Sequence, residues 1–235
     1  MVLSISNNKY MGRLFENSSL RDKIYVFEDR YDAGKKLAEM LAGYKGTDSI
    51  VLAIPSGGVP VASEVALALD LPMDLIITRK LQIPHNPEAG FGAVEPDGEV
   101  ILNEILLNQL RLKEDEIEAE IGKTMERARR QDRIFRKGRP FPSLENKIAI
   151  VVDDGLASGY TMLAAVRFLK KVSPGKIIVA VPTGLERTIK FILPEADELV
   201  CLNVRSGFSF AVAEAYRTWY DLKEEEILSL VRRPA

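Results

Sequence analysis

The feature that most constrains the fold is a buried-strand pattern that ends in two adjacent acids. The apolar run Ile148–Val152 is followed by Asp153 and Asp154, and then by small and hydroxyl residues over Gly155–Thr161. Apolar residues recur at helical spacing directly afterwards, in Met162–Lys171. This order predicts a buried strand, a short loop and a helix, with the loop at the N-terminus of the helix.

The predicted loop has the residue types that a phosphate-binding site needs. Unpaired backbone N–H groups at a helix N-terminus bind phosphate, and the helix dipole favours the anion. Gly155, Ala157 and Gly159 allow a close approach to the backbone, while Ser158 and Thr161 offer hydroxyl donors. The two preceding carboxylates can accept hydrogen bonds from ribose hydroxyls or hold Mg²⁺ that bridges to phosphate oxygens. We expect a pocket for a phosphorylated sugar; the alternative is an ordinary turn with a capping aspartate.

Composition excludes several classes of protein. The 235 residues suit one large α/β domain, alone or with a smaller appendage, and a hydrophobic share of 46% supplies a sizeable core. No apolar run reaches the length of a membrane span, and Met1–Tyr10 lacks an apolar signal core, so we expect a cytoplasmic protein with no membrane partner. Cys201 is the only cysteine, which excludes an intrachain disulfide. The 32 basic and 34 acidic residues nearly balance, which argues against nucleic acid as a general partner.

A second glycine-containing loop follows an earlier predicted strand. Ser49–Ile54 is a continuous apolar run, Pro55–Pro60 contains Ser56, Gly57 and Gly58, and a helix is predicted at Val61–Leu69. Each of the two loops could hold one anionic group. The next predicted strand, Met73–Thr78, ends at Arg79 and Lys80, where the strands of a parallel sheet meet the ligand crevice.

The segment after this strand is a candidate lid. Leu81–Phe91 is predicted to be a long irregular loop, and it contains His85, the only histidine. Gly92–Val94 and Glu99–Leu102 flank a turn sequence and predict a hairpin. A long loop that ends in a hairpin beside a phosphate pocket can close over a ligand. For His85 alone, a surface loop residue is favoured over a catalytic one.

The remaining segments alternate between strand and helix patterns. A long helix is predicted within Asn103–Pro142, acidic at Glu114–Glu120 and rich in arginine and lysine at Arg127–Arg139. This charge order suits the helix dipole and a solvated helix, and nucleic-acid binding would require interleaved aromatic residues. Other predicted elements are a strand at Ile24–Phe27, a helix at Asp32–Tyr44, strands at Lys176–Val181 and Glu198–Val204, and helices at Glu186–Leu193 and Glu224–Val231. The alternation predicts an α/β fold with a doubly wound, mostly parallel sheet and helices on both faces.

The stretch Val151–Thr161, read as Val-Val-Asp-Asp-Gly-Leu-Ala-Ser-Gly-Tyr-Thr, resembles the phosphoribosyl pyrophosphate signature of type I phosphoribosyltransferases. Further segments resemble a poorly characterised bacterial and archaeal branch of that family: Asp29–Gly34, Pro55–Pro60, Arg79–Leu81, Asn86–Glu88, Gly138–Pro140 and Trp219-Tyr220. The resemblance covers the chain from Glu28 onward. It implies an N-terminal extension over 1–27, a core over 28–204 with a lid at 79–103 and a helical excursion at 104–142, and a tail over 205–235. The extension and the tail are both candidates for a small hood over the acceptor.

The resemblance implies a role for each motif in a Mg²⁺-dependent transfer of ribose 5-phosphate from phosphoribosyl pyrophosphate to a small-molecule acceptor. Asp153 and Asp154 would bind the ribose hydroxyls and the metal, and Arg79 and Lys80 would act with the lid residue His85 on the pyrophosphate and Mg²⁺. The 5′-phosphate would be bound by Gly155, Leu156, Ala157, Ser158, Gly159, Tyr160 and Thr161, and the pyrophosphate by Ser56, Gly57 and Gly58. A homodimer is also expected.

Two departures from the family pattern bear on activity. Members of the branch usually carry arginine at the position of Ser56, so one pyrophosphate-binding cation is missing. Enzymes that act on hypoxanthine and guanine carry a carboxylate at the position of Ala157, which argues against those substrates here. A non-catalytic sensor of phosphoribosyl pyrophosphate is therefore the alternative function, while a phosphoacceptor receiver domain would need its acids near the start of the domain. Tail aromatics such as Phe208, Phe210 and Trp219 could stack on the acceptor, although packing is the commoner role.

Overall fold

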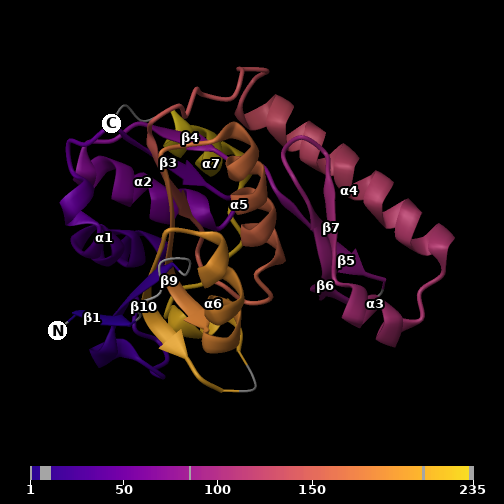
Figure 1. Cartoon of the computed structure of the whole chain (residues 1–235), viewed down its shortest axis with the longest axis horizontal. Helices are drawn as coiled ribbons and strands as arrows, with labels where there is room; N and C mark the ends of the chain where they lie inside the picture. The colour runs from indigo at the N-terminus through magenta and orange to yellow at the C-terminus, as the bar shows by residue number, and fades with distance from the viewer. Residues whose placement is uncertain (1, 6–11, 85, 208–209, 233–235) are drawn as a thin grey trace.

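A computed structural model describes residues 2–5, 12–84, 86–207 and 210–232. Its central sheet has seven strands in the order β1-β2-β10-β9-β8-β3-β4, and every pairing except that of β1 with β2 is parallel (Figure 1). The strands are β1 (Val2–Ile5), β2 (Arg13–Asn17), β3 (Ser49–Ala53), β4 (Met73–Leu75), β8 (Ile148–Val152), β9 (Lys176–Leu185) and β10 (Glu198–Arg205). The predicted α/β fold with a mostly parallel sheet is confirmed.

Helices cover both faces of this sheet because the buried strands are apolar on both sides. In β8, Ile150 and Val152 pack in one core with α1 and α2, while Ala149 and Val151 pack in a second core with α5 and α6. Figure 1 shows these two pairs of helices on opposite sides of the strands. The helices are α1 (Arg30–Met40), α2 (Gly58–Leu69), α5 (Tyr160–Val172), α6 (Glu186–Ile192) and, beside α2, α7 (Glu224–Val231).

A smaller antiparallel sheet stands beside the central one with a core of its own. It consists of β5 (Arg79–Ile83), β6 (Asn86–Val94) and β7 (Val100–Leu102), followed by α3 (Glu104–Leu110) and α4 (Glu114–Phe135). Leu81, Phe91 and Val94 are buried against apolar side chains of the two helices. The predicted β6–β7 hairpin is confirmed, and the prediction of an irregular loop over 81–91 is wrong. Two register shifts in the β5–β6 pairing, next to Gln82, hide the alternation of that hairpin in the sequence.

The long charged helix α4 is anchored to the central sheet at its C-terminal end. The Arg136 guanidinium donates from Nε and Nη2 to the two carboxylate oxygens of Asp74 in β4, each at 3.2 Å, and also pairs with Asp132. Arg136 is buried, so the paired donors fix the end of the helix in direction as well as in position. In Figure 1, α4 extends from this end along β5, β6 and β7.

The N-terminal segment contributes β1 and β2 to the central sheet, where the sequence pattern predicted no strand. Residues 13–16 of β2 pair in parallel with residues 198–201 of β10. The predicted strand at Ile24–Phe27 is wrong, since only Phe27 forms a bridge, with Tyr216. β2 escaped detection because a short strand with mixed polarity lacks a clear two-residue period.

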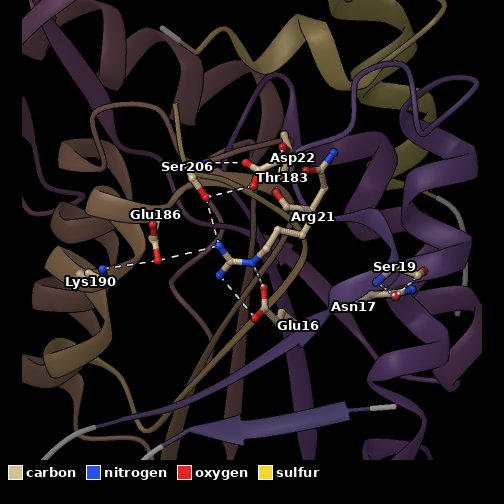
Figure 2. A network of polar contacts seen from close by, with 10 residues as sticks. Glu16, Asn17, Ser19, Arg21, Asp22, Thr183, Glu186, Lys190 and Ser206 are labelled. Atoms are coloured by element: carbon tan, nitrogen blue, oxygen red, sulfur yellow. Dashed lines mark hydrogen bonds and ion pairs between the residues drawn. The ribbon is translucent and has the colours of Figure 1, made fainter. Parts of the chain in front are cut away.

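Arg21 joins this N-terminal segment to the loop after β10 and to α6. Its guanidinium donates to Glu16 at 3.2 and 3.4 Å and to Ser206 Oγ at 3.1 Å, and lies 3.8 Å from Glu186 of α6 (Figure 2). Asp22 accepts hydrogen bonds from the backbone and the hydroxyl of Ser206. The segment is therefore tied to the loop after β10 and to α6, not loosely appended.

The cysteine is buried, and the described helices are too short or too polar to cross a membrane. Cys201 lies in β10 with no exposed surface, and burial raises the pKa of its thiol well above the ordinary value. No helix among the residues placed by the structure is long and apolar enough to cross a membrane.

Candidate active site

The loop between β8 and α5 forms one wall of a cavity of about 730 Å³. The cavity is lined by Asp153 through Met162 from this loop, by Leu185, Arg187, Thr188 and Phe191 around α6, by Phe210 and Val212 of the tail, and by Lys80, Ala89, Gly90, Asn103 and Leu106 from the small sheet and α3. Residues of both predicted phosphate-pocket and lid segments thus face one space. It lies at the carboxyl ends of the parallel strands, where ligands of open α/β sheets bind.

Backbone hydrogen bonds hold the β8–α5 loop in shape. The Leu156 N–H donates to Thr183 O at 2.9 Å, and the Leu185 N–H donates to Leu156 O at 3.0 Å. These two bonds hold the loop against the end of β9. Gly159 ends the loop at φ +84°, a conformation that side chains rarely adopt. The first residues of α5, Tyr160 to Met162, line the cavity, and the N–H groups of a helix N-terminus suit an anion site.

The acid pair is partly buried and electrostatically unequal. Arg30 Nε of α1 donates to Asp154 Oδ2 at 2.9 Å, with the two side chains 8% and 14% exposed. Burial raises the pKa of Asp153 well above its ordinary value, and the charge of Asp154 raises it further. Burial also raises the pKa of Asp154, but the Arg30 guanidinium opposes that rise. Asp154, beside Arg30, is therefore the more easily ionised carboxylate of the pair, because the pKa of Asp153 is raised further.

Sequence reasoning assigned no role to Arg30, although the Asp29–Gly34 segment carried part of the resemblance. The Trp219 ring lies 3.7 Å from the guanidinium carbon of Arg30, and Arg30 Nη1 donates to the backbone oxygen of Tyr220 at 3.0 Å. The buried Tyr216 hydroxyl donates to Asp154 O at 2.6 Å. These tail aromatics pack around the Arg30–Asp154 pair, whereas Phe210 faces the cavity. Phe208 lies outside the described residues.

The earlier glycine loop abuts the acid pair. A methyl group added at Gly57 would lie 1.9 Å from Asp154 Oδ2, and one at Gly58 would lie 2.6 Å from Val152 O. Only a residue without a side chain fits at these two positions, which brings the backbone of the first loop against the second. The peptide bond between Pro55 and Ser56 is cis.

The predicted basic residues lie in two different cavities. Lys80 lines the large cavity with Asp153 and Asp154, whereas Arg79 and Ser56 line a second cavity of about 350 Å³. The two side chains diverge because neighbours in a strand point to opposite faces. His85 lies outside the described residues, so its predicted part in the lid stays a prediction.

The donor set of the large cavity suits a metal that is bound partly by its substrate. Within the described residues, no group of three or more histidine, cysteine, aspartate or glutamate side chains gathers to form a self-contained metal site. Mg²⁺ commonly uses one or two carboxylates and completes its shell with phosphate oxygens and water. Asp153 and Asp154 fit that pattern, with Asp153 the less constrained of the two.

Comparisons with known proteins agree on one family. The family model for the phosphoribosyl transferase domain matches residues 22–217. Two curated proteins from Mycobacterium tuberculosis, strains CDC 1551 and H37Rv, are each 38% identical over 208 residues and are named provisionally as phosphoribosyl transferases. The alignment covers 88% of this chain and 47% of each relative, so the chain spans about half the length of the curated proteins it matches.

One solved structure resembles the whole arrangement. The crystal structure of protein TT1426 from Thermus thermophilus aligns with a TM-score of 0.69 and 32% sequence identity. The alignment covers 87% of this chain and 97% of that one. The likeness therefore extends beyond the central sheet to nearly all of the related molecule.

Proposed function

Because the chain belongs to the phosphoribosyl transferase domain family, we propose that it transfers ribose 5-phosphate from phosphoribosyl pyrophosphate to a small-molecule acceptor and releases pyrophosphate. The observation that carries the proposal is the meeting of the acid pair, the N-terminus of α5 and Lys80 around one cavity. A sugar that bears phosphate at one end and a diphosphate at the other needs these three chemistries side by side: hydroxyl acceptors, an anion-binding helix end and a cation.

In the proposed reaction the acceptor attacks C1 of the ribose while the bond from C1 to the pyrophosphate oxygen breaks. The electron pair of that bond leaves with pyrophosphate, and the acceptor loses a proton. Positive charge develops on the sugar ring in between, and Asp153 and Asp154 lie on the cavity wall where their negative charge would favour it. The N–H groups of Tyr160 and Thr161, at the start of α5, would hold the 5′-phosphate and so fix the position of C1.

The proposal includes Mg²⁺, with Asp153 and Asp154 as its protein ligands. When bound, the metal would neutralise charge on the departing pyrophosphate. The raised pKa of Asp153 then has a consequence for binding, because an ionised carboxylate is the better ligand for a cation. Binding of Mg²⁺ and donor should release a proton from Asp153, so the affinity should rise with pH through the raised pKa.

The acceptor is proposed to enter beside Phe210 and Val212 of the tail. These two side chains line the cavity together with Tyr160 and Phe191, and they offer an apolar surface on which a planar base could stack. Ala157 brings no carboxylate to this surface, which favours acceptors other than hypoxanthine and guanine. The tail thus acts as the hood in this proposal.

The test is an assay for pyrophosphate release. The protein is incubated with labelled phosphoribosyl pyrophosphate, Mg²⁺ and a panel of bases, and the expected result is release that depends on one acceptor class. The variant Asp153→Asn with Asp154→Asn should lose donor binding in calorimetry while keeping its fold. Tight donor binding with no pyrophosphate release across a broad panel would favour the alternative function, a non-catalytic sensor of phosphoribosyl pyrophosphate. Ser56 favours this alternative because it supplies no positive charge for the pyrophosphate. Unchanged donor affinity in the double variant would refute the site itself.

A further inference from the structure

The second cavity, of about 350 Å³, lies between β5, α4 and α7 and is strongly basic. It is lined by Ser56, Arg79, Arg127, Arg130, Gln131, Ile134, Phe135, Leu222, Glu224 and Ile227. Three arginines therefore face a single exposed glutamate, Glu224. Its lining includes Ser56, which belongs to the glycine loop that abuts the acid pair. The positively charged space therefore reaches this loop.

Arg79 is the most constrained of the three cations. Its Nε is buried and finds no hydrogen-bond partner within the part of the chain that the structure describes. Burial lowers the pKa of the Arg79 guanidinium, and the positive charge of Arg127 lowers it further. A buried guanidinium donor without an acceptor costs free energy, as does a like charge beside it. Both costs are relieved when an anion with several oxygens enters the cavity.

The spacing of arginines on α4 separates those that face this cavity from those that do not. Arg127, Arg130 and Ile134 lie three and four residues apart, which places them on one face of the helix. Arg129 lines a different cavity, between α4 and the β6–β7 turn. No carboxylate among the described residues pairs with Arg127 or Arg130; Arg127 Nη1 donates only to Gln82 Oε1, at 3.4 Å.

The backbone of α4 that carries these arginines is anchored at its C-terminal end. Arg136, less than two turns beyond Arg130, donates both hydrogen bonds to Asp74 of β4, and Phe135 is buried in the core beside α1 and α2. Neither Arg127 nor Arg130 needs a change in the backbone to reach an anion in the cavity. The exposed side chains of Arg127 and Arg130 still lose rotamer freedom when they bind an anion, so only the fixed helix backbone is prepared in advance.

We propose that Arg127 and Arg130 of α4, together with Arg79, bind the diphosphate group of the donor and supply the positive charge that Ser56 does not. The identity of the anion rests on the proposed function, while the site itself rests on the cavity. Arginine pairs with phosphate oxygens through two parallel N–H groups, which makes it suited to a diphosphate. The charged helix thereby becomes part of the donor site and not only a solvated surface.

The first experiment measures binding of pyrophosphate alone by calorimetry. The variant Arg127→Gln with Arg130→Gln should bind pyrophosphate at least about tenfold more weakly, the loss of one or two charge-assisted contacts. Arg129→Gln removes the same charge from the same helix outside the cavity and should change the affinity by less than about twofold. An equal loss of pyrophosphate affinity in the double variant and in Arg129→Gln would mean that only the net charge of the helix matters, which would overturn the proposal. A wild-type protein that does not bind pyrophosphate would overturn it as well.

The second experiment is a rescue that does not depend on turnover. Ser56→Arg, added to the double variant, places a guanidinium in the same cavity and should restore pyrophosphate affinity by about fivefold or more. A rescued protein that melts like wild type but binds no better would refute the shared site. If pyrophosphate binding depends on Arg127 and Arg130 but no ribose 5-phosphate is transferred, this inference holds and the proposed enzymatic function is refuted. If ribose 5-phosphate is transferred equally well by the double variant, the enzymatic function holds and this inference is refuted.

Discussion

Arg30 is the residue on which the geometry of the acid pair depends. It touches Asp154 at one end of its guanidinium and the Trp219 ring with its face, and it donates to the Tyr220 backbone. Nearly all of its side chain is buried, and Asp154 is the carboxylate that it pairs with directly. A buried ion pair adds little net stability over an apolar pair, but removing one partner leaves the other charge buried and uncompensated.

Replacing Arg30 should therefore be costly. Arg30→Gln is expected to lower the free energy of unfolding by about 3–5 kcal/mol, because Asp154 stays buried without its cation. Lys36→Gln on the same helix is the matched control: Lys36 pairs with Asp32 at 2.8 Å, but both side chains are about a third exposed or more. Its expected cost is below about 1 kcal/mol. Urea unfolding measures both, and similar costs for the two variants would contradict the assigned role of Arg30.

Asp153 should limit the stability of the protein at neutral pH. Burial, and then the charge of Asp154, raises the pKa of Asp153 in the folded state. For a carboxyl group whose folded pKa is raised, the stabilising contribution is complete below the unfolded value of about 3.9 and is lost as the pH rises through the folded pKa. Asp153→Asn keeps an oxygen that can accept the 2.8 Å hydrogen bond from the Asp154 N–H but cannot ionise.

The expected outcome is a variant that is more stable than wild type near neutral pH and loses this advantage in acid. Urea unfolding at a series of pH values gives the difference in free energy directly. The matched change Asp48→Asn removes a carboxylate that is 71% exposed and should change the free energy of unfolding at neutral pH by less than about 1 kcal/mol. A constant difference between Asp153→Asn and wild type across the series would argue against the raised pKa.

At the scale of elements, Lys171 of α5 adds an ionic contact to the apolar packing that joins the β6–β7 hairpin to the central sheet. Lys171 Nζ of α5 lies 2.7 Å from Glu95 Oε2, 2.8 Å from Asp97 Oδ2 and 2.9 Å from Glu99 Oε2. The three carboxylates all come from the hairpin and its turn, and Glu95 is only 3% exposed. The hairpin belongs to the small sheet whose strands β5 and β6 border the large cavity, so this contact influences how the cavity is covered.

Removing the lysine should loosen the hairpin. Lys171→Met is expected to speed amide exchange in β6 and β7 by about fivefold, the loss of roughly 1 kcal/mol from a partly exposed cluster, and added salt should shrink the difference. Lys170→Met is the control, since Lys170 pairs with Glu195 away from the hairpin. Hydrogen exchange followed by mass spectrometry distinguishes the two. Equal rates in both variants would mean that apolar packing, and not the Lys171 cluster, holds the hairpin.

The same elements provide a test of the lid. Donor and Mg²⁺ together should protect the β5–β6 hairpin from protease, because Lys80, Ala89 and Gly90 line the cavity that the donor would fill. Inorganic phosphate at the same concentration is the control, as it would occupy the helix end without spanning to Lys80. Cleavage that is unaffected by the donor would remove the proposed part of this hairpin in covering the site.

What could be predicted from the sequence depended on how local the signal was. The Ile148–Val152 strand, its acid pair and the helix after it form one continuous pattern, and the structure reproduces them almost residue by residue. The β5–β6 hairpin was missed because Pro84 and Pro87 and two register shifts conceal its alternation. Arg30 was missed for a different reason: its partner lies 124 residues away, and no local spacing reports such a contact.

At the scale of the molecule, Arg21 joins the N-terminal strand β2 to the loop after β10 and to α6. Its guanidinium ties Glu16 of β2 to Ser206 after β10 (Figure 2). The Glu16 side chain is 6% exposed, so Arg21→Ala would leave a buried carboxylate without that partner and should cost about 1–3 kcal/mol. Lys190→Gln, which removes a 72% exposed partner of Glu186, should cost almost nothing. A thermal melt of each variant tests whether the N-terminal strand stabilises the whole sheet or unfolds separately.

The single thiol, in β10, allows opening of the central sheet to be followed in the wild-type protein. Cys201 has no exposed surface and lies in the middle of the sheet, so a thiol reagent can reach it only when the sheet separates. The labelling rate then counts opening events, and a ligand that binds the closed molecule slows the rate in proportion to its occupancy. Donor affinity can thus be read from wild-type protein by the rate of thiol labelling, without an acceptor, a product or any engineered probe.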